Sequence, residues 1–190
     1  MNTVTGKTAS ESREPVRGVH CDYTLKGLQN IIRLSNRSRI NSKASEAIEA
    51  LNYSTKMGTP YDGPRFAAYS IWRPVKTVRR DPIAVAAWKS IAAEDFVKFD
   101  YRAPAEGGKG EYLIEALSVK PAKGGYDGHR WYWLPMQEPD EVLVIKLADS
   151  ESEIRKGEVS PGTAHGSPVL NDVENEDPRE SIEVRVLAFW

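Results

Sequence analysis

The sequence predicts a mainly β protein with flanking helices, built as a jelly-roll barrel with two helices packed on its outside. Two observations carry this prediction. From Phe66 onward, short apolar segments recur at intervals of roughly ten to fifteen residues, with Gly- and Pro-rich turns between them, which is typical of sandwiches and barrels. Ahead of Phe66, two segments carry apolar residues at helical spacing.

The N-terminal part contains a polar tail, one strand and two helices. We expect residues 1–14 to form a flexible tail, since they are rich in Ser, Thr and Glu, and residues 15–190 to form a single domain. The elements that follow the tail are a strand over Val16–Tyr23, a helix over Leu25–Leu34 capped by Thr24, a loop at 36–39, and a helix over Lys43–Leu51.

The remaining elements are mostly strands. They are expected over Phe66–Trp72, Phe96–Tyr101, Tyr112–Val119, His129–Leu134, Val142–Leu147 and Ile182–Phe189. Pro74 ends the first of them, and turns are expected at 104–111 and 121–128. For Ile83–Ile91, the pattern favours a short helix or turn over an extended segment. The acidic stretch Asp149–Ser160 is expected to be a solvated loop with one helical turn at most.

Composition excludes several classes of protein. Apolar residues make up 40% of the 190-residue chain, charged residues 28%, and the formal net charge is -1, so no strong field recruits nucleic acid or an anionic membrane. The single cysteine, Cys21, excludes an internal disulfide framework and fits a reducing compartment. No segment approaches the roughly 20 apolar residues that span a bilayer, or resembles a signal peptide. We therefore expect a cytoplasmic protein that acts on a small molecule.

His20 and Asp22 are the first candidate metal ligands. They stand two residues apart on a predicted strand, so both side chains point to one face, while Cys21 points away. His165 lies late in the chain within PGTAHGSPV, where a ligand from a separate strand would complete a 2-His-1-carboxylate triad for Fe(II). The alternative for His20 is a strand-end histidine hydrogen-bonded to a neighbouring carboxylate. His129 lacks an acidic residue at ligand spacing.

Arg179 and Ser181 are candidate cosubstrate residues. They stand at the mouth of the final predicted strand and face the same side. A buried arginine beside a metal site can bind the distal carboxylate of a keto diacid through its planar fork, and a serine hydroxyl can donate a further hydrogen bond. His-x-Asp, a distal histidine and Arg-x-Ser therefore form one joint pattern, which indicates an Fe(II) and 2-oxoglutarate site.

A family resemblance supports this interpretation. It rests on VHCDYTLKG (19–27), YSIWRPVKTVRRDPIAV (69–85), HRWYWLPMQEPDEVLVIKLADS (129–150), GTAHGSPV (162–169) and PRESIEVRVLAFW (178–190). Through these segments the chain resembles the family of gibberellin GA4 desaturase, AsaB-type hydroxylase/desaturases and the CmcJ component of cephamycin methoxylation. The resemblance implies a cupin-like double-stranded β-helix. It also implies an oxygenase using Fe(II) and 2-oxoglutarate to hydroxylate or desaturate a small, largely apolar natural product of secondary metabolism.

Several points stay open at this stage. The candidate substrate-binding residues are Arg73, Tyr23, Tyr69, Trp131 and Trp133, for which a surface ion pair or core packing is the alternative role. Family members usually carry a longer segment before the His-x-Asp strand, so we expect a barrel trimmed at its N-terminal side or completed by a second copy in a homodimer. Two rival functions remain: a cofactor-free cyclase or isomerase, for example a hetero-Diels–Alderase, and a non-catalytic small-molecule-binding partner subunit.

Overall fold

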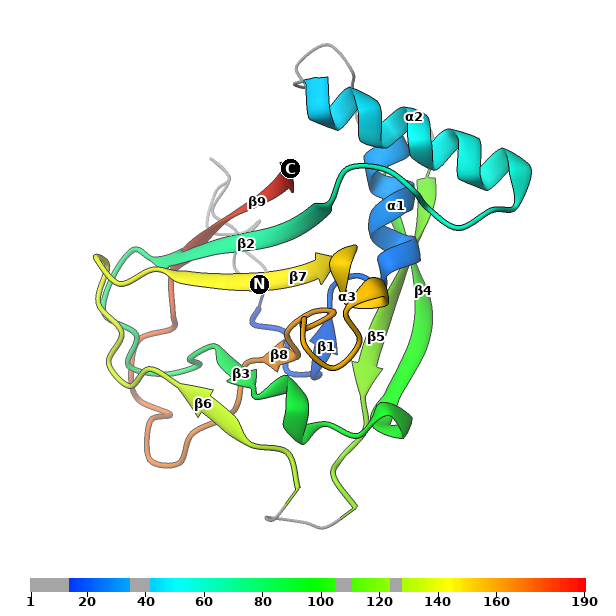
Figure 1. The fold of residues 1–190 in the computed structure, drawn as a ribbon. Coiled ribbons are helices and arrows are strands. Elements are labelled where there is room, and N and C mark those ends of the chain that lie inside the picture. The colour runs from blue at the N-terminus through cyan, green and yellow to red at the C-terminus, as the bar shows by residue number, and fades with distance from the viewer. Residues whose placement is uncertain (1–13, 35–41, 105–110, 124–127) are drawn as a thin grey trace.

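Two antiparallel β-sheets form the body of the molecule (Figure 1). The computed structural model describes residues 14–34, 42–104, 111–123 and 128–190. A six-stranded sheet has the order β4-β5-β1-β8-β3-β6, and a three-stranded sheet has the order β7-β2-β9. The strands are β1 His20–Cys21, β2 Phe66–Pro74, β3 Ala84–Ala86, β4 Phe96–Pro104, β5 Glu111–Val119, β6 Trp131–Trp133, β7 Leu143–Asp149, β8 His165–Gly166 and β9 Ser181–Phe189. The predicted jelly-roll class is confirmed.

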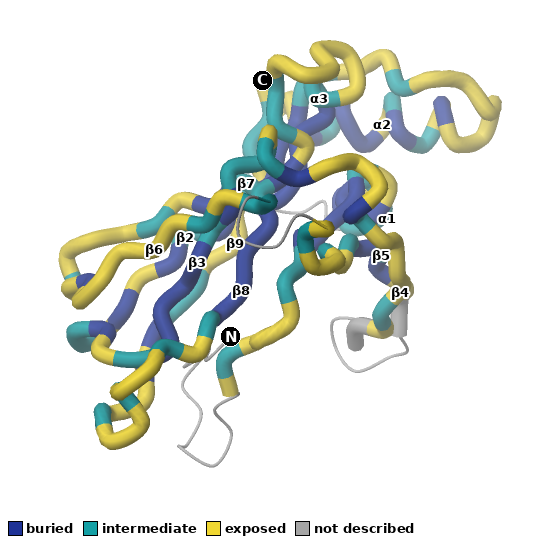
Figure 2. Tube along the Cα trace, turned by 90° about the horizontal axis from the view of Figure 1, so that it is seen from below, coloured by how far each residue is buried: buried dark blue, intermediate teal, exposed yellow. Residues whose placement is uncertain are grey.

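The main core lies between the two sheets. Strand β2 is central in the smaller sheet, with β7 and β9 on its two sides, and its residues Phe66, Ala68 and Trp72 are at most 1% exposed. They pack in one cluster with residues of β7 and with Ile114 of β5 in the larger sheet. Figure 2 shows that the buried residues gather on the inner strands and that the peripheral loops are exposed. Apolar burial therefore holds the sheets together.

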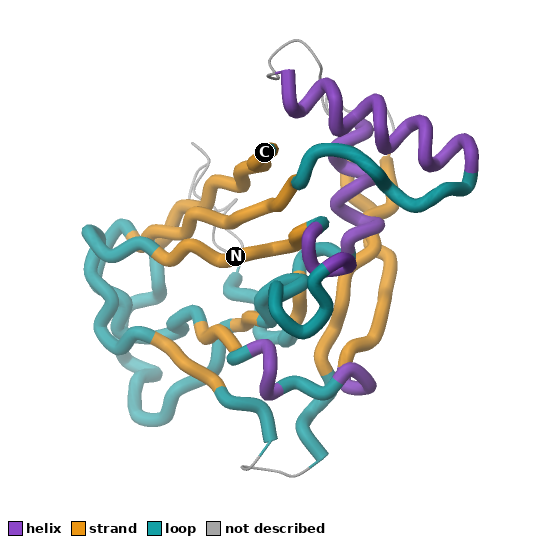
Figure 3. The backbone as a smooth tube through the Cα atoms, in the orientation of Figure 1, coloured by secondary structure: helices purple, strands orange, loops and turns teal. Residues whose placement is uncertain are grey.

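The two long helices, α1 (Leu25–Leu34) and α2 (Ser42–Met57), lie together beside the strands (Figure 3). Thr24 caps α1 as predicted, because its Oγ1 accepts a hydrogen bond from the Gly27 amide at 3.0 Å. Leu28 of α1 and Leu51 of α2 belong to the main core cluster, so the helices close one side of it. The third helix, α3 (Glu151–Ile154), is a single turn, and short 3-10 turns occupy Trp88–Ser90 and Ala93–Asp95. None of the described helices is long and apolar enough to cross a membrane.

Strand β1 is much shorter than the predicted strand over Val16–Tyr23. Only His20 and Cys21 pair regularly, with β5 on one side and β8 on the other. The residues before them are held by single hydrogen bonds, from the Ser167 amide to the Val16 carbonyl and from the Val119 amide to the Val19 carbonyl. The apolar pattern therefore predicts where this segment lies in the chain. It does not predict how short the regular pairing with β5 and β8 is.

Two further predictions need correction. The segment Ile83–Ile91 is a helix or turn only in its second half, because Ala84–Ala86 forms strand β3 between β6 and β8. Asp149 is not solvated: it ends β7, is fully buried, and its carboxylate accepts hydrogen bonds from Arg65 and Lys146.

Some predictions fall on residues that the structure does not describe. These are the tail up to residue 13, the loop at 36–39, most of the turn at 104–111, and residues 124–127 of the Gly-rich loop.

Candidate metal centre

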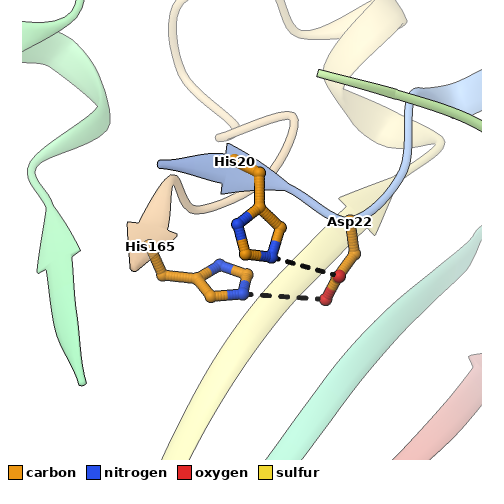
Figure 4. A group of neighbouring side chains, drawn as sticks. All are labelled: His20, Asp22 and His165. Atoms are coloured by element: carbon orange, nitrogen blue, oxygen red, sulfur yellow. Dashed lines mark ion pairs between the residues drawn. The ribbon is translucent and has the colours of Figure 1, made fainter. Parts of the chain in front are cut away.

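Strand pairing brings the three predicted metal ligands together from distant parts of the chain (Figure 4). In the ladder between β1 and β8, His20 stands directly opposite His165. Asp22 follows β1 immediately, and its carboxylate turns toward both imidazoles. One ligand atom from each residue lies within 4.8 Å of the other two. Within the described residues, this is the only such group of three that could hold a metal ion.

The distances inside this group leave a space that a cation fits. The Nε2 atoms of His20 and His165 lie 3.7 Å from the Oδ1 and Oδ2 atoms of Asp22, respectively, which is too long for hydrogen bonds. The Asp22 Oδ2 and His165 Nε2 atoms are buried without a hydrogen-bond partner. A buried polar atom without a partner costs free energy, so each such atom calls for an explanation. A divalent ion between them supplies one.

The far sides of both rings are fixed by backbone carbonyls. His20 Nδ1 lies 2.8 Å from the Gly18 carbonyl oxygen, and His165 Nδ1 lies 2.9 Å from that of Thr163. Each Nδ1 therefore carries the proton and donates, which leaves the Nε2 lone pair turned toward Asp22. Burial and the neighbouring His20 lower the pKa of His165 against the opposing effect of Asp22, so the ring is neutral at pH 7. Imidazoles held in this way are typical metal ligands.

Arg185 of β9 also reaches the triad, and the sequence interpretation did not include it. Its Nη2 lies 3.3 Å from Asp22 Oδ1, its Nη1 donates to the Tyr23 hydroxyl at 2.9 Å, and its Nε donates to Glu183 Oε1 at 3.2 Å. Burial lowers the pKa of Arg185, but Asp22, Tyr23 and Glu183 raise it by more. Strand alternation was the available signal, because residues 181, 183 and 185 share one face.

Arg179 lies beside the triad, as predicted. It is 2% exposed and lines a small hollow of about 20 Å³ together with His20 and His165. Its Nη1 donates to the Asp81 carbonyl at 2.5 Å, and its guanidinium lies 5.2 Å from the centre of the Trp72 ring. Burial lowers its pKa to about 10, which leaves it cationic at pH 7. The hollow has room for about one water molecule, so binding of a dicarboxylate there requires side chains to move.

Ser181 is fully buried two residues further on, opposite Pro74 in the β2–β9 ladder. It is not among the described residues that line the small hollow beside Arg179. The structure therefore places Ser181 in the interior near the start of β9, and its predicted role toward a cosubstrate stays a prediction.

A larger cavity of about 610 Å³ opens on two of the three triad residues, His20 and Asp22. His20, Asp22 and Arg185 line it together with Phe99 of β4 and Tyr101. This volume falls within the range of small-molecule sites, about 300–1,000 Å³. A still larger hollow of about 940 Å³ has Cys21 in its wall, but none of the three candidate ligands lines it.

The candidate substrate residues of the first half of the chain divide between two places. Tyr23 lies at the triad through its hydrogen bond with Arg185. Arg73 is exposed, and its Nε donates to a backbone carbonyl, that of Pro139, at 2.6 Å. Tyr69 alternates along β2 with the buried Ser70, whose side chain faces the interior, so Tyr69 faces outward. Of these three, only Tyr23 is brought to the triad.

The aromatic residues of β6 lie elsewhere. Trp131 and Trp133 line a separate hollow of about 240 Å³ beside β3 and β8, outside the cavity that His20 and Asp22 line. His129, next to them in sequence, is not in the triad either. Its Nε2 lies 2.9 Å from Asp95 Oδ2, and both side chains are less than 10% exposed. His129 thus has a carboxylate partner that sequence spacing did not reveal.

Comparisons with known proteins identify relatives of this chain. The profile of a family described as an oxidoreductase/YMDC permease-like domain matches residues 2–189. The gibberellin cluster GA4 desaturase of Gibberella fujikuroi is 36% identical over 97% of this chain and 53% of its own length. The hydroxylase/desaturase AsaB of Aspergillus flavus is 32% identical over 93% of this chain and 78% of its own length.

Solved structures show the same likeness. A variant of the iron and alpha-ketoglutarate-dependent endoperoxidase NvfI superposes with a TM-score of 0.66 at 28% identity, covering 96% of this chain and 58% of that one. The chain thus spans a little over half of the NvfI chain and of the GA4 desaturase.

Proposed function

The chain belongs to the oxidoreductase family that includes the GA4 desaturase and AsaB-type hydroxylase/desaturases, and on this premise we propose that it is an Fe(II)/2-oxoglutarate-dependent oxygenase. His20, Asp22 and His165 hold the metal. The observation that carries the proposal is the pair of buried, unpartnered atoms, Asp22 Oδ2 and His165 Nε2, that face one another across 3.7 Å. Two imidazoles and one carboxylate on one side of an ion leave its other positions open, as this class of oxygenase requires.

Each residue of the site has a definite task in this proposal. The carbonyls of Gly18 and Thr163 hold the two imidazoles in the tautomer that binds a metal. Arg179 gives up its hydrogen bond to the Asp81 carbonyl and binds the distal carboxylate of 2-oxoglutarate instead, with Ser181 as a further donor. When bound, Fe(II) and 2-oxoglutarate would supply the chemistry that activates dioxygen, the oxidant, toward a C–H bond of the substrate.

The cavity indicates the class of substrate. Phe99 and Tyr101 present aromatic walls in the same cavity that His20 and Asp22 line. Such walls bind a small, largely apolar molecule and keep water from the reacting bond. The relatives are named as desaturases and hydroxylases, one of them from a gibberellin cluster. We therefore propose hydroxylation or desaturation of a natural product of secondary metabolism.

The test combines metal analysis with turnover of the cosubstrate. The protein is reconstituted with Fe(II) without oxygen, its iron content is measured, and succinate formed from 2-oxoglutarate is followed after oxygen is admitted. We expect close to one iron per chain, and loss of both iron and succinate in Asp22→Ala and His165→Ala. Asp140→Ala is the matched control, because Asp140 is exposed. Full iron retention in His165→Ala contradicts the proposal, and substrate turnover without iron favours the cofactor-free cyclase.

A further inference from the structure

Arg185 connects the smaller sheet to the metal centre through several contacts at once. Its three nitrogen atoms are directed at acceptors on Asp22, Tyr23 and Glu183. Glu183 is itself held, because its Oε1 accepts a hydrogen bond from Ser70 Oγ at 2.7 Å and its side chain is 5% exposed. The guanidinium also lies over the Tyr23 ring, 5.6 Å from its centre. The fork is therefore anchored both on β9 of the smaller sheet and on the segment that directly follows β1 of the larger sheet.

The contact with Asp22 selects one carboxylate oxygen. Arg185 Nη2 approaches Oδ1, whereas the unpartnered oxygen that faces His165 is Oδ2. A donor on one oxygen fixes the rotation of the carboxylate and so aims the other oxygen. We propose that Arg185 is a positioning residue for the metal ligand Asp22, which keeps Oδ2 directed at the metal position. This inference rests on the proposed function, since it assumes that the triad holds a metal ion.

A role as an anchor for an anionic substrate is less consistent with these contacts. A substrate carboxylate in the cavity would compete with three protein acceptors that already engage the guanidinium. Glu183 also places a carboxylate 3.2 Å from the Arg185 Nε, which offsets the positive charge beside the metal position. The arrangement thus keeps the geometric effect of the arginine fork while limiting its repulsion of a cation.

The proposal is tested by Co(II) binding to the full chain, followed by titration calorimetry and by the visible absorption of the bound ion. We expect Arg185→Met to weaken Co(II) binding by about 10- to 100-fold, as is typical when a partner of a ligand is removed. Arg185→Lys should also bind more weakly and show an altered spectrum, because its single nitrogen cannot reach the three separate acceptors that the three guanidinium nitrogens engage. Arg155→Met is the matched control, since Arg155 is exposed and its side chain pairs with the nearby Glu158.

A neutral substitution separates geometry from charge. Tyr23→Phe removes one anchor of the guanidinium without changing any charge at neutral pH, and it should weaken Co(II) binding by about 2- to 10-fold. If the charge of Arg185 alone mattered, Arg185→Met would bind Co(II) more tightly and Arg185→Lys would match the wild type. Those results overturn the proposal.

Different results would contradict the proposed function and the role of Arg185. A wild-type chain that binds no Co(II) or Fe(II) contradicts the proposed function. If the wild type, Arg185→Met and Arg185→Lys all bind Co(II) with the same affinity and spectrum, the proposed role of Arg185 is wrong. The proposed function is not contradicted by that result. Thermal unfolding of each variant shows whether it is folded, and if Arg185→Met is not, Arg185→Lys and Tyr23→Phe decide.

Discussion

Gly27, in the first turn of α1, offers a sharp test of how the helix meets the larger sheet. A Cβ atom at this position would lie 2.2 Å from the Glu115 carbonyl oxygen of β5, and 3.1 and 3.2 Å from the Glu115 carbonyl carbon and amide nitrogen. All three are backbone atoms, which cannot turn aside as a flexible side chain can. Gly27→Ala therefore forces α1 and β5 apart.

The size of the effect follows from three contributions. Alanine in place of glycine favours a helix by about 1 kcal/mol. Overpacking against a rigid neighbour costs about 1–3 kcal/mol. Separation of α1 from β5 also strains the hydrogen bond from the Thr24 amide to the Glu115 carbonyl, 2.9 Å long, which is worth about 1 kcal/mol. We expect Gly27→Ala to lower the free energy of unfolding by about 1–3 kcal/mol.

Urea unfolding followed by tryptophan fluorescence measures this change. Gly18→Ala is the matched control, since a Cβ there meets no atom within 4 Å, and it should stay within about 0.5 kcal/mol of the wild type. Helix propensity alone predicts that Gly27→Ala is stabilising. A variant as stable as the wild type, or more stable, would refute the reasoning from packing.

Three further predictions concern buried residues. Asp149→Asn should lower the free energy of unfolding by about 2 kcal/mol at pH 7, because it leaves Arg65 and Lys146 without their buried carboxylate. Burial raises the pKa of Asp149, but its hydrogen bonds lower it by more, so the pKa is lower in the folded chain than in the unfolded one. The stability difference between the two proteins is therefore fully present above about pH 3.9 and shrinks as the pH falls through the lowered folded pKa, which an unfolding series from pH 7 downward can check. Leu51→Ala, at a side chain 1% exposed, should cost about 2–5 kcal/mol in the same urea assay, and a loss below 1 kcal/mol would mean that α2 contributes little to the core. Cys21 should resist a thiol reagent at pH 8 until the chain is unfolded, since burial and Asp22 raise its pKa to about 12; rapid labelling of the folded protein would show that it is accessible.

The candidate site was largely predictable because its signals are local. His20 and Asp22 share a face through the two-residue period of a strand, and Arg179 stands just before a strongly β-branched segment. What could not be predicted was which residue of the smaller sheet completes the site. Arg185 shares a strand face with Ser181, but only the tertiary structure, which brings β9 to the segment after β1, places its guanidinium within 3.3 Å of Asp22.

For the candidate substrate residues Trp131 and Trp133, the sequence signal was misleading. Trp131 and Trp133 form an aromatic strand, yet β6 is the edge strand of the larger sheet, and its side chains line a different hollow from the triad. Composition can mark a segment as apolar and aromatic. It cannot say which wall of a barrel that segment becomes.

The sequence by itself determined the positions of α1 and most of the strands, the Thr24 cap, and the closeness of His20 to Asp22. These depend on periodicity and capping within a few residues, which a single segment carries alone. The tertiary structure decided that His20 stands opposite His165, that Asp149 is buried and that Gly27 has no room for a side chain. Each of these depends on contacts between segments far apart in the chain, and such contacts exist only after the sheets have paired.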